Sequence, residues 1–288
     1  MNVARTPDEL EPAERAVAIG TFDGVHRGHR TAIDAVVATG LRPTVVTFEP
    51  HPRAVLGYEV ELLSTFERRL ELIEVAGVAD VLAVEFTTAL SLLAPEEFVT
   101  QILRPIGTQT VLAGEGFRFG HKRRGDLELL RALGIDAGAV PILEGVSSSR
   151  IREHLKNGEI REAAALLGRA PELEGPVVYG DQRGGTLGFP TANLSVDRGI
   201  LVPKYGIYAG QALGHRAAVS IGVNPHYGGV ERRIEAFLLD FTGDLYGTRL
   251  RLELWERLRD ERAFESEADL VEQIVRDTDE ARAASPPV

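Results

Sequence analysis

The stretch Gly20-Thr-Phe-Asp-Gly-Val-His-Arg-Gly-His29 follows a short apolar run, residues 16–19, and leads into residues 29–37, whose apolar positions have helical spacing. A glycine-rich turn between a strand and a helix is typical of an anion site, because the first N–H groups of a helix have no partner within it. In an open parallel sheet, ligands bind outside the carboxyl ends of the strands. This stretch therefore predicts an α/β fold with a phosphate site at the turn.

The residue types in this turn suit phosphate chemistry. Gly24 and Gly28 let the backbone approach a phosphate closely. His26 and His29 can donate hydrogen bonds to phosphate oxygens on which charge develops during nucleotidyl transfer. Either histidine alone is more typical of a solvated turn, whereas the His-x-Gly-His spacing directly after a strand favours a catalytic role for both. The predicted phosphate-binding residues of the turn are Gly20, Thr21, Phe22, Asp23, Gly24 and Gly28.

Strand-like and helix-like segments alternate through the first half of the chain. The strand-like runs after the turn are residues 44–48, 81–86 and 111–113. Between them, Ser64 and Asp126 stand where helix N-caps are expected. Short apolar strands that alternate with helices predict a parallel sheet covered by helices on both faces.

The pattern changes after about Gly168, where strand-length runs separated by turns replace the alternation. These runs are residues 206–213, 217–222, 234–241 and 248–255. In the last run, leucines alternate with charged residues, as in a half-buried antiparallel strand. Residues 266–281 then have the spacing of a closing helix, with Ser266 where its N-cap is expected. We expect two domains: a parallel α/β sheet over residues 1–168, and an antiparallel β-barrel with a closing helix over residues 169–288.

Composition narrows the classes of function. The chain has 288 residues, no cysteine and a formal net charge of −11. The absence of cysteine excludes disulfides and thiolate metal sites, and it favours the reducing cytoplasm. The acidic balance argues against nucleic-acid binding, which needs clustered positive charge. No apolar run reaches the roughly 20 residues of a membrane span, and the N-terminal segment lacks the apolar core of a signal peptide. We expect no membrane association, and self-association, if it occurs, to be weak.

The turn after the first strand resembles the nucleotide-binding motif of the HxGH nucleotidyltransferases. Further blocks narrow the resemblance to the bifunctional riboflavin kinase/FMN adenylyltransferase family. The blocks similar to the adenylyltransferase half are Thr47-Phe-Glu-Pro-His-Pro-Arg53, Gly114-Glu-Gly-Phe-Arg-Phe-Gly120 and Val146-Ser-Ser-Ser-Arg-Ile-Arg152. Those similar to the kinase half are Gly188-Phe-Pro-Thr-Ala-Asn193, Ser220-Ile-Gly-Val-Asn-Pro225 and Glu235-Ala-Phe-Leu-Leu-Asp-Phe241. The resemblance implies a Rossmann-like domain before a flavokinase-type barrel, with riboflavin, FMN, FAD, ATP and ADP as ligands and Mg²⁺ as cofactor.

For the adenylyltransferase half, the resemblance implies that FMN attacks ATP and that pyrophosphate leaves. The FMN phosphate is already anionic, so this reaction needs alignment and charge neutralisation rather than a general base. A second phosphate site is expected where another helix begins, at Ser147, Ser148, Ser149 and Arg152. The alternative is that these serines only cap the helix. The resemblance assigns to the flavin Phe48, Arg53, Phe117 and Phe119. For Phe117 and Phe119, packing in the core is the alternative.

The kinase half lacks a Gly-x-x-x-x-Gly-Lys-Ser/Thr loop, so a P-loop mechanism is excluded. The resemblance assigns Thr191 and Asn193 to Mg²⁺, for which their hard oxygen atoms are suitable. It makes Glu235 the catalytic base that accepts the proton of a ribityl hydroxyl; a salt bridge to Arg232 or Arg233 is the alternative. The remaining residues of this half assigned to ATP are Gly188 and Pro190. Asp181 and Arg183 belong to a glycine-rich segment that is either a flap over phosphates or a surface turn.

Some positions depart from the family pattern. Gly116 stands where the family has Asn or Asp, so a polar contact of the adenylyltransferase site is missing. In the kinase half, Gly185 replaces an Arg and His226 replaces a Thr. These departures leave alternatives open: a riboflavin kinase with an impaired adenylyltransferase half, or a flavin carrier without turnover. A nucleotidyltransferase for pantetheine phosphate or glycerol phosphate is a further alternative, but it would have no use for the second half.

Overall fold

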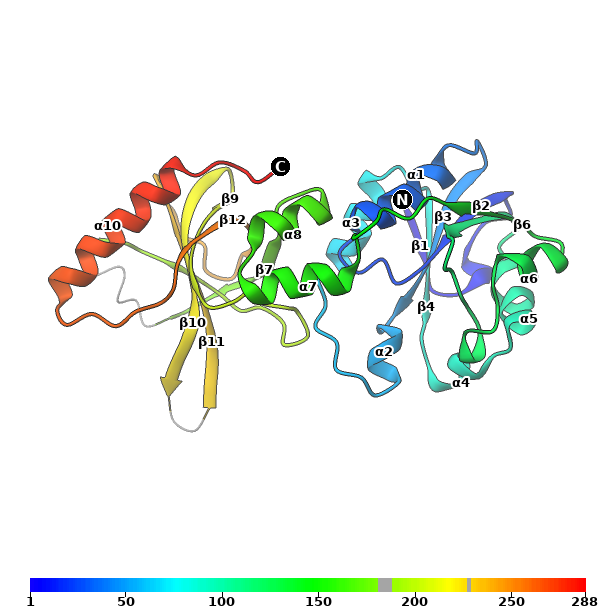
Figure 1. The fold of residues 1–288 in the computed structure, drawn as a ribbon, viewed down its shortest axis with the longest axis horizontal. Helices are drawn as coiled ribbons and strands as arrows, with labels where there is room; N and C mark the ends of the chain where they lie inside the picture. The colour runs from blue at the N-terminus through cyan, green and yellow to red at the C-terminus, as the bar shows by residue number, and fades with distance from the viewer. Residues whose placement is uncertain (181–187, 227–228) are drawn as a thin grey trace. The chain divides into compact units, whose positions relative to one another are not determined.

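The computed structural model describes residues 1–180, 188–226 and 229–288. The chain divides into two compact units, Met1–Ser147 and Ser148–Val288 (Figure 1). The first unit is built on a parallel sheet, and the second contains a closed antiparallel barrel. The predicted fold class, α/β followed by a β-barrel with a closing helix, is confirmed.

The sheet of the first unit has the strand order β1-β4-β3-β2-β5-β6, and all neighbouring strands are parallel. The strands are β1 (Asn2–Ala4), β2 (Arg15–Ile19), β3 (Arg42–Glu49), β4 (Asp80–Glu85), β5 (Thr108–Gly114) and β6 (Asp136–Val140). The helices are α1 (Arg27–Val37), α2 (Pro52–Val55), α3 (Phe66–Val75), α4 (Thr88–Leu92), α5 (Pro95–Phe98) and α6 (Leu127–Ala132). Shorter helical segments are η1 (Pro7–Glu9), η2 (Val99–Leu103) and η3 (His121–Arg123).

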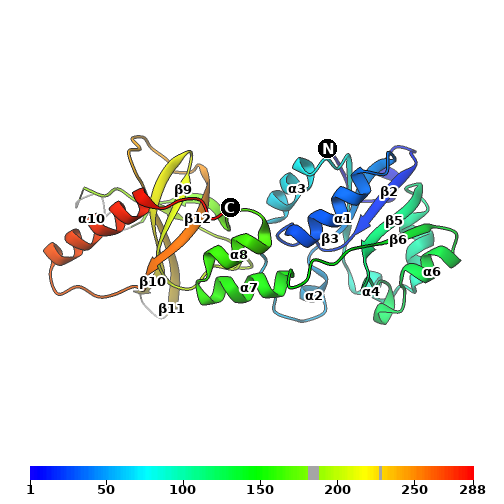
Figure 2. The same ribbon diagram turned by 45° about the horizontal axis from the view of Figure 1, so that its top comes forward.

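Alternate side chains of the central strands are buried against opposite layers of helices, because successive residues of a strand point to opposite faces. Ala16 of β2 belongs to a core with Ile33 of α1 and Ile73 of α3. Val17, the next residue, belongs to another core, with Leu130 of α6. Figures 1 and 2 show α1 and α3 on one side of the strands and α6 on the other. Both faces of the sheet are therefore buried, which explains why its central strands are apolar throughout.

The order of the strands reverses between β2 and β5, which are neighbours in the sheet although β3 and β4 separate them in the sequence. At such a switch point, the connections leave the sheet in opposite directions and open a crevice at the carboxyl ends of the strands. Residues 20–26 follow β2 at this edge, and residues 115–120 follow β5. The fold therefore brings two of the sequence motifs to the edge where an α/β sheet binds ligands.

Of the two helix caps predicted in the first half of the chain, one is confirmed and one is wrong. Asp126 caps α6 as predicted, because its carboxylate accepts a hydrogen bond from the Leu129 N–H at 3.0 Å. The N-cap of α3 is Thr65. The prediction of Ser64 as this cap was therefore wrong. The Ser64 hydroxyl instead accepts a hydrogen bond from the Gly24 N–H, at 3.3 Å. Ser64 thus makes a contact between segments 40 residues apart, which local spacing cannot predict.

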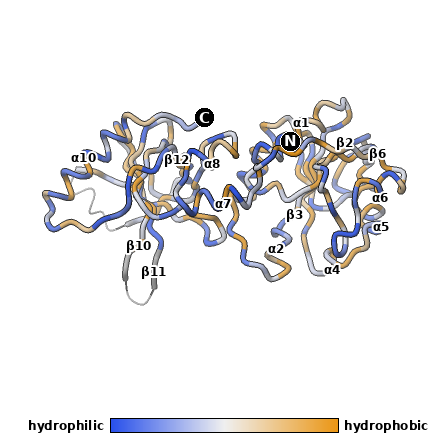
Figure 3. The backbone as a smooth tube through the Cα atoms, viewed as in Figure 1, coloured by the Kyte–Doolittle hydropathy of each residue, from blue (hydrophilic) through white to orange (hydrophobic). Residues whose placement is uncertain are grey.

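The barrel of the second unit has the strand order β10-β11-β8-β7-β12-β9. Its strands are β7 (Glu172–Val178), β8 (Ala192–Leu194), β9 (Gly206–Ala212), β10 (His215–His226), β11 (Gly229–Leu238) and β12 (Arg249–Arg259). The helix α10 (Glu267–Ala283) begins at the predicted cap, Ser266, whose hydroxyl accepts from the Asp269 N–H at 3.2 Å. Along α10, hydrophilic and hydrophobic residues alternate (Figure 3), as expected for a helix with one buried face.

The second unit begins with α7 (Ser148–Asn157) and α8 (Ile160–Leu167), which we expected in the first domain. Arg161 of α8 pairs with Glu256 of β12, with 2.8 Å between Nη2 and Oε2. The carbonyl of Leu155 in α7 accepts a hydrogen bond from the Lys204 N–H at 3.0 Å. These contacts join both helices to the barrel. The compact units consequently divide at Ser147, while Gly168 is the left-handed residue that ends α8, with a φ of 78°.

Candidate active sites of the two units

The turn after β2 is held in an unusual backbone shape. Phe22 and Val25 have φ values of 50° and 38°, in the left-handed region that is strained for such side chains, and both side chains are buried. Gly24 has a φ of 76°, and a Cβ there would lie 2.9 Å from the side chain of Leu63. Only glycine fits this position without strain. The buried side chains of Phe22 and Val25 and the close packing of Gly24 against Leu63 therefore determine the conformation of the turn.

Asp23 anchors the turn from within. Its carboxylate is buried, with 1% of the residue exposed, and accepts a hydrogen bond from the Leu63 N–H at 2.8 Å. The Gly24 N–H donates to Ser64 nearby, so two successive residues of the turn are bound to the segment before α3. The structure thus gives Asp23 a structural contact, and its direct role toward ATP stays a prediction.

His26 and His29 lie side by side at the start of α1. Their rings are stacked, with centroids 3.7 Å apart and 12° between the planes. His26 is the N-cap of the helix, and its Nδ1 accepts a hydrogen bond from the His29 N–H at 3.2 Å. An accepting Nδ1 places the proton of a neutral imidazole on Nε2. A donating Nε2 is what a phosphate-binding histidine needs.

His29 is held neutral by its surroundings. Burial lowers the pKa of His29 well below its usual value, and the nearby His26 and Arg69 lower it further. Its buried Nδ1 has no hydrogen-bond partner among the described residues. Gly28 lets the two rings sit this close to the helix, because a Cβ there would lie 3.3 Å from the His26 ring. The structure thus brings the predicted histidine pair together at the carboxyl end of β2.

Arg69 is a residue of this edge that the sequence analysis missed. It belongs to α3 and is 0% exposed. Its Nη1 donates to the carbonyls of Thr21 at 3.2 Å and Phe48 at 3.1 Å, and its Nη2 donates to Glu49 Oε2 at 3.0 Å. The sequence gives no local signal for this contact, because Arg69 lies in an ordinary amphipathic helix 20 to 48 residues from its acceptors.

The aromatic residues assigned to the flavin lie in one chain of ring contacts beyond β5. Phe117 and Phe119 have centroids 5.6 Å apart, and Phe119 contacts Phe98 at 5.8 Å. Phe98 in turn lies 6.4 Å from Phe48 at the end of β3. Phe119 is buried in the core, which is the alternative that we had left open, whereas Phe48 and Phe117 are only partly buried against it. Arg53 is exposed, and its guanidinium lies 5.3 Å from the Tyr58 ring centroid.

The second predicted phosphate group spans the division between the units. Ser147 ends the first unit, whereas Ser148, Ser149 and Arg152 lie in the first turns of α7. A helix start with hydroxyl groups and a guanidinium suits an anion. Their binding of phosphate stays a prediction.

In the barrel, the predicted kinase residues lie together. Glu235 of β11 is directly opposite Asn193 of β8 in the strand register. The Thr191 hydroxyl lies 3.5 Å from Glu235 Oε1, and Arg233 Nη2 lies 2.8 Å from the same oxygen. The salt bridge that we named as the alternative for Glu235 is therefore present, with Arg233. It holds the carboxylate, whose side chain is 23% exposed, beside the Thr191 hydroxyl.

Two cavities meet at Thr191. The helix-side cavity, of about 320 Å³, lies between the barrel and α10. Its lining is about half apolar, including Phe237, Phe264 and Ile274, and half polar or charged, including Glu235 and Arg233. The turn-side cavity, of about 270 Å³, is lined by Pro190 and by residues 241–246. Thr191 lines both cavities and contacts Glu235, which also pairs with Arg233. A ligand in either cavity could therefore reach this polar cluster. This arrangement suits group transfer between two ligands.

Buried polar side chains join α10 to the barrel beside the helix-side cavity. Arg259 of β12 binds Asp277 of α10 through two contacts, at 2.8 and 2.6 Å, and Asp277 also accepts from Gln273. Gln273 and Asp277 are 7% and 4% exposed. Sequence reasoning missed these residues, since charged positions on a helix normally face solvent. The network fixes the helix that closes the cavity.

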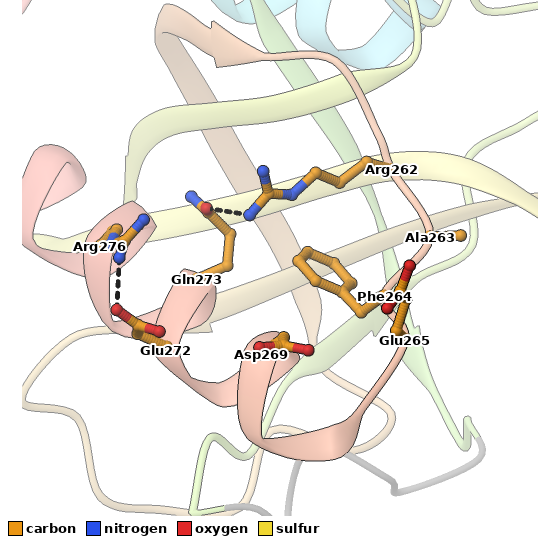
Figure 4. A pocket seen from close by; sticks show the side chains of 8 residues that line it. All are labelled: Arg262, Ala263, Phe264, Glu265, Asp269, Glu272, Gln273 and Arg276. Atoms are coloured by element: carbon orange, nitrogen blue, oxygen red, sulfur yellow. Dashed lines mark hydrogen bonds and ion pairs between the residues drawn. The ribbon is translucent and has the colours of Figure 1, made fainter.

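A further hollow of about 330 Å³ lies beside the first turns of α10 (Figure 4). Arg262 donates to Gln273 there at 2.5 Å, and Arg276 pairs with Glu272. The hollow shares Arg262 and Phe264 with the helix-side cavity. Its charges are mixed in sign, and it contains none of the residues that we predicted from the sequence.

Other residues named from the sequence make structural contacts or lie outside the described residues. We expected Asp240 and Asp244 to serve turns. Asp244 does so, accepting a hydrogen bond from the Tyr246 N–H at 2.9 Å, whereas Asp240 binds Arg282 of α10, 42 residues away, with both carboxylate oxygens. Asp181, Arg183 and Gly185 lie outside the described residues. Gly188, at the edge of this gap, has a φ of 87°.

Comparison with known proteins agrees with the division into two units. A FAD synthetase family model matches residues 8–149, and a riboflavin kinase model matches residues 167–285. A bifunctional riboflavin kinase/FMN adenylyltransferase from Bacillus subtilis is 34% identical, over 94% of this chain and 92% of that protein. The chain belongs to this bifunctional family. The Escherichia coli K12 relative of the same name is 33% identical, over 98% of this chain and 95% of that protein.

A crystal structure described as a macrolide-efflux protein from Streptococcus pneumoniae also matches the chain. Its TM-score is 0.91 at 27% sequence identity, and the match covers 98% of this chain and 99% of that one. Within residues 1–180, 188–226 and 229–288, this member of the bifunctional family has no helix that is both long and apolar enough to span a membrane. The TM-score shows likeness of fold, and the family models give the class of the chain.

Proposed function

We propose that this chain makes FAD from riboflavin in two ATP-dependent steps. The barrel unit phosphorylates riboflavin to FMN, and the parallel-sheet unit adenylylates FMN and releases pyrophosphate. The observation that carries the proposal is the presence in one chain of the stacked His26–His29 pair and of the Thr191–Glu235 cluster between two cavities. Each arrangement suits one of the two phosphate reactions.

In the kinase step, riboflavin lies in the helix-side cavity, whose aromatic and aliphatic lining suits a planar ring system. ATP enters from the turn-side cavity, next to Pro190 and Gly188. Glu235 accepts the proton of the terminal ribityl hydroxyl, the hydroxyl oxygen bonds to the γ-phosphorus, and the bond to the ADP oxygen breaks. Arg233, whose Nη2 lies 2.8 Å from Glu235 Oε1, holds the carboxylate in place for this step.

The donor atoms near Glu235 fit Mg²⁺. Thr191 and Asn193 offer a hydroxyl and an amide oxygen, which are hard ligands that a magnesium ion accepts beside phosphates and water. Gly180 leaves room for the amide, because a Cβ at Gly180 would lie 2.5 Å from the Asn193 side chain. Bound there, the ion would neutralise charge on the ATP phosphates.

In the adenylyltransferase step, a phosphate oxygen of FMN bonds to the α-phosphorus of ATP and the bond to pyrophosphate breaks. No proton has to be removed from the nucleophile. His26 donates from Nε2 to the phosphates, and His29 donates as a neutral imidazole beside it. Residues 21–23 of the turn bring their backbone toward the same anions, while the N–H groups of Gly20 and Gly24 bond Val46 and Ser64. Phe48, Phe117 and Arg53 stand at the flavin, and Ser147, Ser148, Ser149 and Arg152 supply the second phosphate contact.

The test is to incubate the chain with riboflavin, ATP and Mg²⁺ and to separate the flavins by chromatography. Formation of FMN and then FAD is the expected result, and excess chelator should abolish both. Accumulation of FMN alone would favour a kinase with an impaired adenylyltransferase half, as Gly116 suggests. Tight flavin binding without ATP consumption would favour a carrier. The proposal includes a cytoplasmic location and no nucleic-acid partner, in line with the acidic, cysteine-free composition.

A further inference from the structure

Two arginines of the first unit are fully buried, and they lie at opposite edges of the same sheet. Arg15 begins β2 and donates to Asp80 Oδ2 at 3.0 Å and to the Ile106 carbonyl at 2.7 Å. Arg69 reaches the other edge, where β2 and β3 end. Both residues are 0% exposed. Only Arg69 is bonded to the turn that contains the histidine pair.

The acceptors of Arg69 define what it holds in place. One Nη atom spans the Thr21 carbonyl, which is in the turn, and the Phe48 carbonyl, which is at the end of β3. The other Nη atom binds the Glu49 carboxylate, whose side chain is 29% exposed. The Thr21 carbonyl also accepts from the Thr47 hydroxyl, at 3.2 Å. The ends of two strands are thus joined to the turn through one planar guanidinium.

The hydrogen bonds of Arg69 matter because the backbone of the turn is strained. Phe22 and Val25 are held in left-handed backbone, and such conformations persist only where the surroundings fix them. Thr21 directly precedes the strained residues, and His26 directly follows them. Loss of the bond to Thr21 would let the turn relax and would move the cap of α1 together with the stacked rings.

We propose that Arg69 is a positioning residue for adenylyl transfer, whose buried guanidinium fixes the turn so that His26 and His29 meet the phosphates in line. Arg69 acts through the backbone of the turn. The inference rests on the proposed adenylyltransferase function of this unit. In addition, its charge is one of the influences that keep His29 neutral, after burial and His26.

The test compares Arg69→Met and Arg69→Lys with Arg15→Met and Arg15→Lys in the full chain. These pairs are matched, because both arginines are fully buried and each bonds backbone carbonyls and one carboxylate. We expect both Met variants to lower the melting temperature of the first unit. We expect only Arg69→Met to lower the kcat of FMN adenylylation, by about 100-fold, since misplacement of reacting groups by about 1 Å has that effect. Arg69→Lys, which keeps the charge but not the planar fork, should recover about tenfold of this loss.

Riboflavin phosphorylation by the same variants serves as the internal control and should stay within about twofold of the wild-type rate. If Arg69→Met keeps its kcat within about threefold, or if the Arg15 and Arg69 variants lose kcat equally, Arg69 has only a structural role and the proposal is wrong. If a Met variant does not fold, the Lys pair decides by the same criterion. A wild-type chain that makes no FAD from FMN would instead refute the proposed function of the unit.

Discussion

Replacement of Glu235 by Gln tests the kinase mechanism most directly. The amide keeps the shape of the side chain but cannot accept the ribityl proton. A positioned general base contributes about 10²- to 10⁴-fold to a rate, which corresponds to about 2.7 to 5.4 kcal/mol of activation free energy at about 1.36 kcal/mol per tenfold. The stability of the barrel should change little, because Glu235 and Arg233 are 23% and 27% exposed and such a pair contributes about 1 kcal/mol or less. The loss of rate should therefore greatly exceed any effect of unfolding.

The assay follows FMN formation from riboflavin and, separately, FAD formation from supplied FMN. Glu256→Gln is the matched control, because Glu256 also lies on a barrel strand and pairs with an arginine at 2.8 Å but lines neither cavity. We expect Glu235→Gln to lose at least about 100-fold in kinase kcat and to keep its adenylyltransferase rate, and Glu256→Gln to keep both. A kinase rate within about tenfold of wild type would refute the general-base role. Loss of both activities in Glu235→Gln would contradict the independence of the two sites.

Three further changes test the first unit. His26→Ala should lower the kcat of FMN adenylylation by about 10²- to 10³-fold. His26→Asn should be equally slow but about 1 kcal/mol more stable than His26→Ala, because Asn can still cap α1. Enzyme kinetics and thermal unfolding measure the two effects separately. Gly116 is exposed, with no atom within 4 Å of a Cβ built there, so Gly116→Asn should fold normally. The added amide should lower the KM for FMN by up to about tenfold. An unchanged KM would mean that an Asn side chain at this position has no role in FMN binding. Asp80→Asn should destabilise the first unit by about 3 to 5 kcal/mol, since it breaks a buried pair with Arg15. Burial alone would raise the pKa of Asp80, but hydrogen bonds from Arg42 and Arg15 outweigh it and lower that pKa. The stabilisation by the Asp80 carboxylate is therefore fully present above its unfolded-state pKa of about 3.9 and is lost as the pH falls through its pKa in the folded protein. The free energies of unfolding of wild type and Asp80→Asn, measured in denaturant, should therefore converge at low pH.

The locations of the predicted sites followed from local patterns to a large extent. The strand before the turn and the helix after it were recognisable because apolar spacing reflects burial on one or both faces. The His-x-Gly-His motif necessarily lies at the carboxyl end of β2, since a strand followed by a helix in a parallel sheet places their connection there. Asp126 and Ser266 were predictable as caps because the contact spans only three residues.

Residues that act across the fold were not predictable in this way. Arg69 and Asp277 lie on helices whose sequence pattern marks charged residues as solvent-facing, yet both are buried against strands distant in the sequence. Ser64 had the spacing of a cap, but its hydroxyl binds the turn after β2 and Thr65 caps the helix. Such contacts depend on which segments the sheet brings together, and the sequence carries no period that records this.

By itself, the sequence determined the fold class of this protein: a parallel α/β half with a phosphate turn, followed by an antiparallel barrel. It did so because apolar periodicity, glycine turns and helix caps are local properties. The tertiary structure alone decided how the groups meet. It stacked His26 on His29, placed Thr191 at the junction of two cavities, and put the Arg69 guanidinium beneath the strained turn. These relations arise from long-range packing, since each joins residues whose distance in space is set by the whole sheet or barrel.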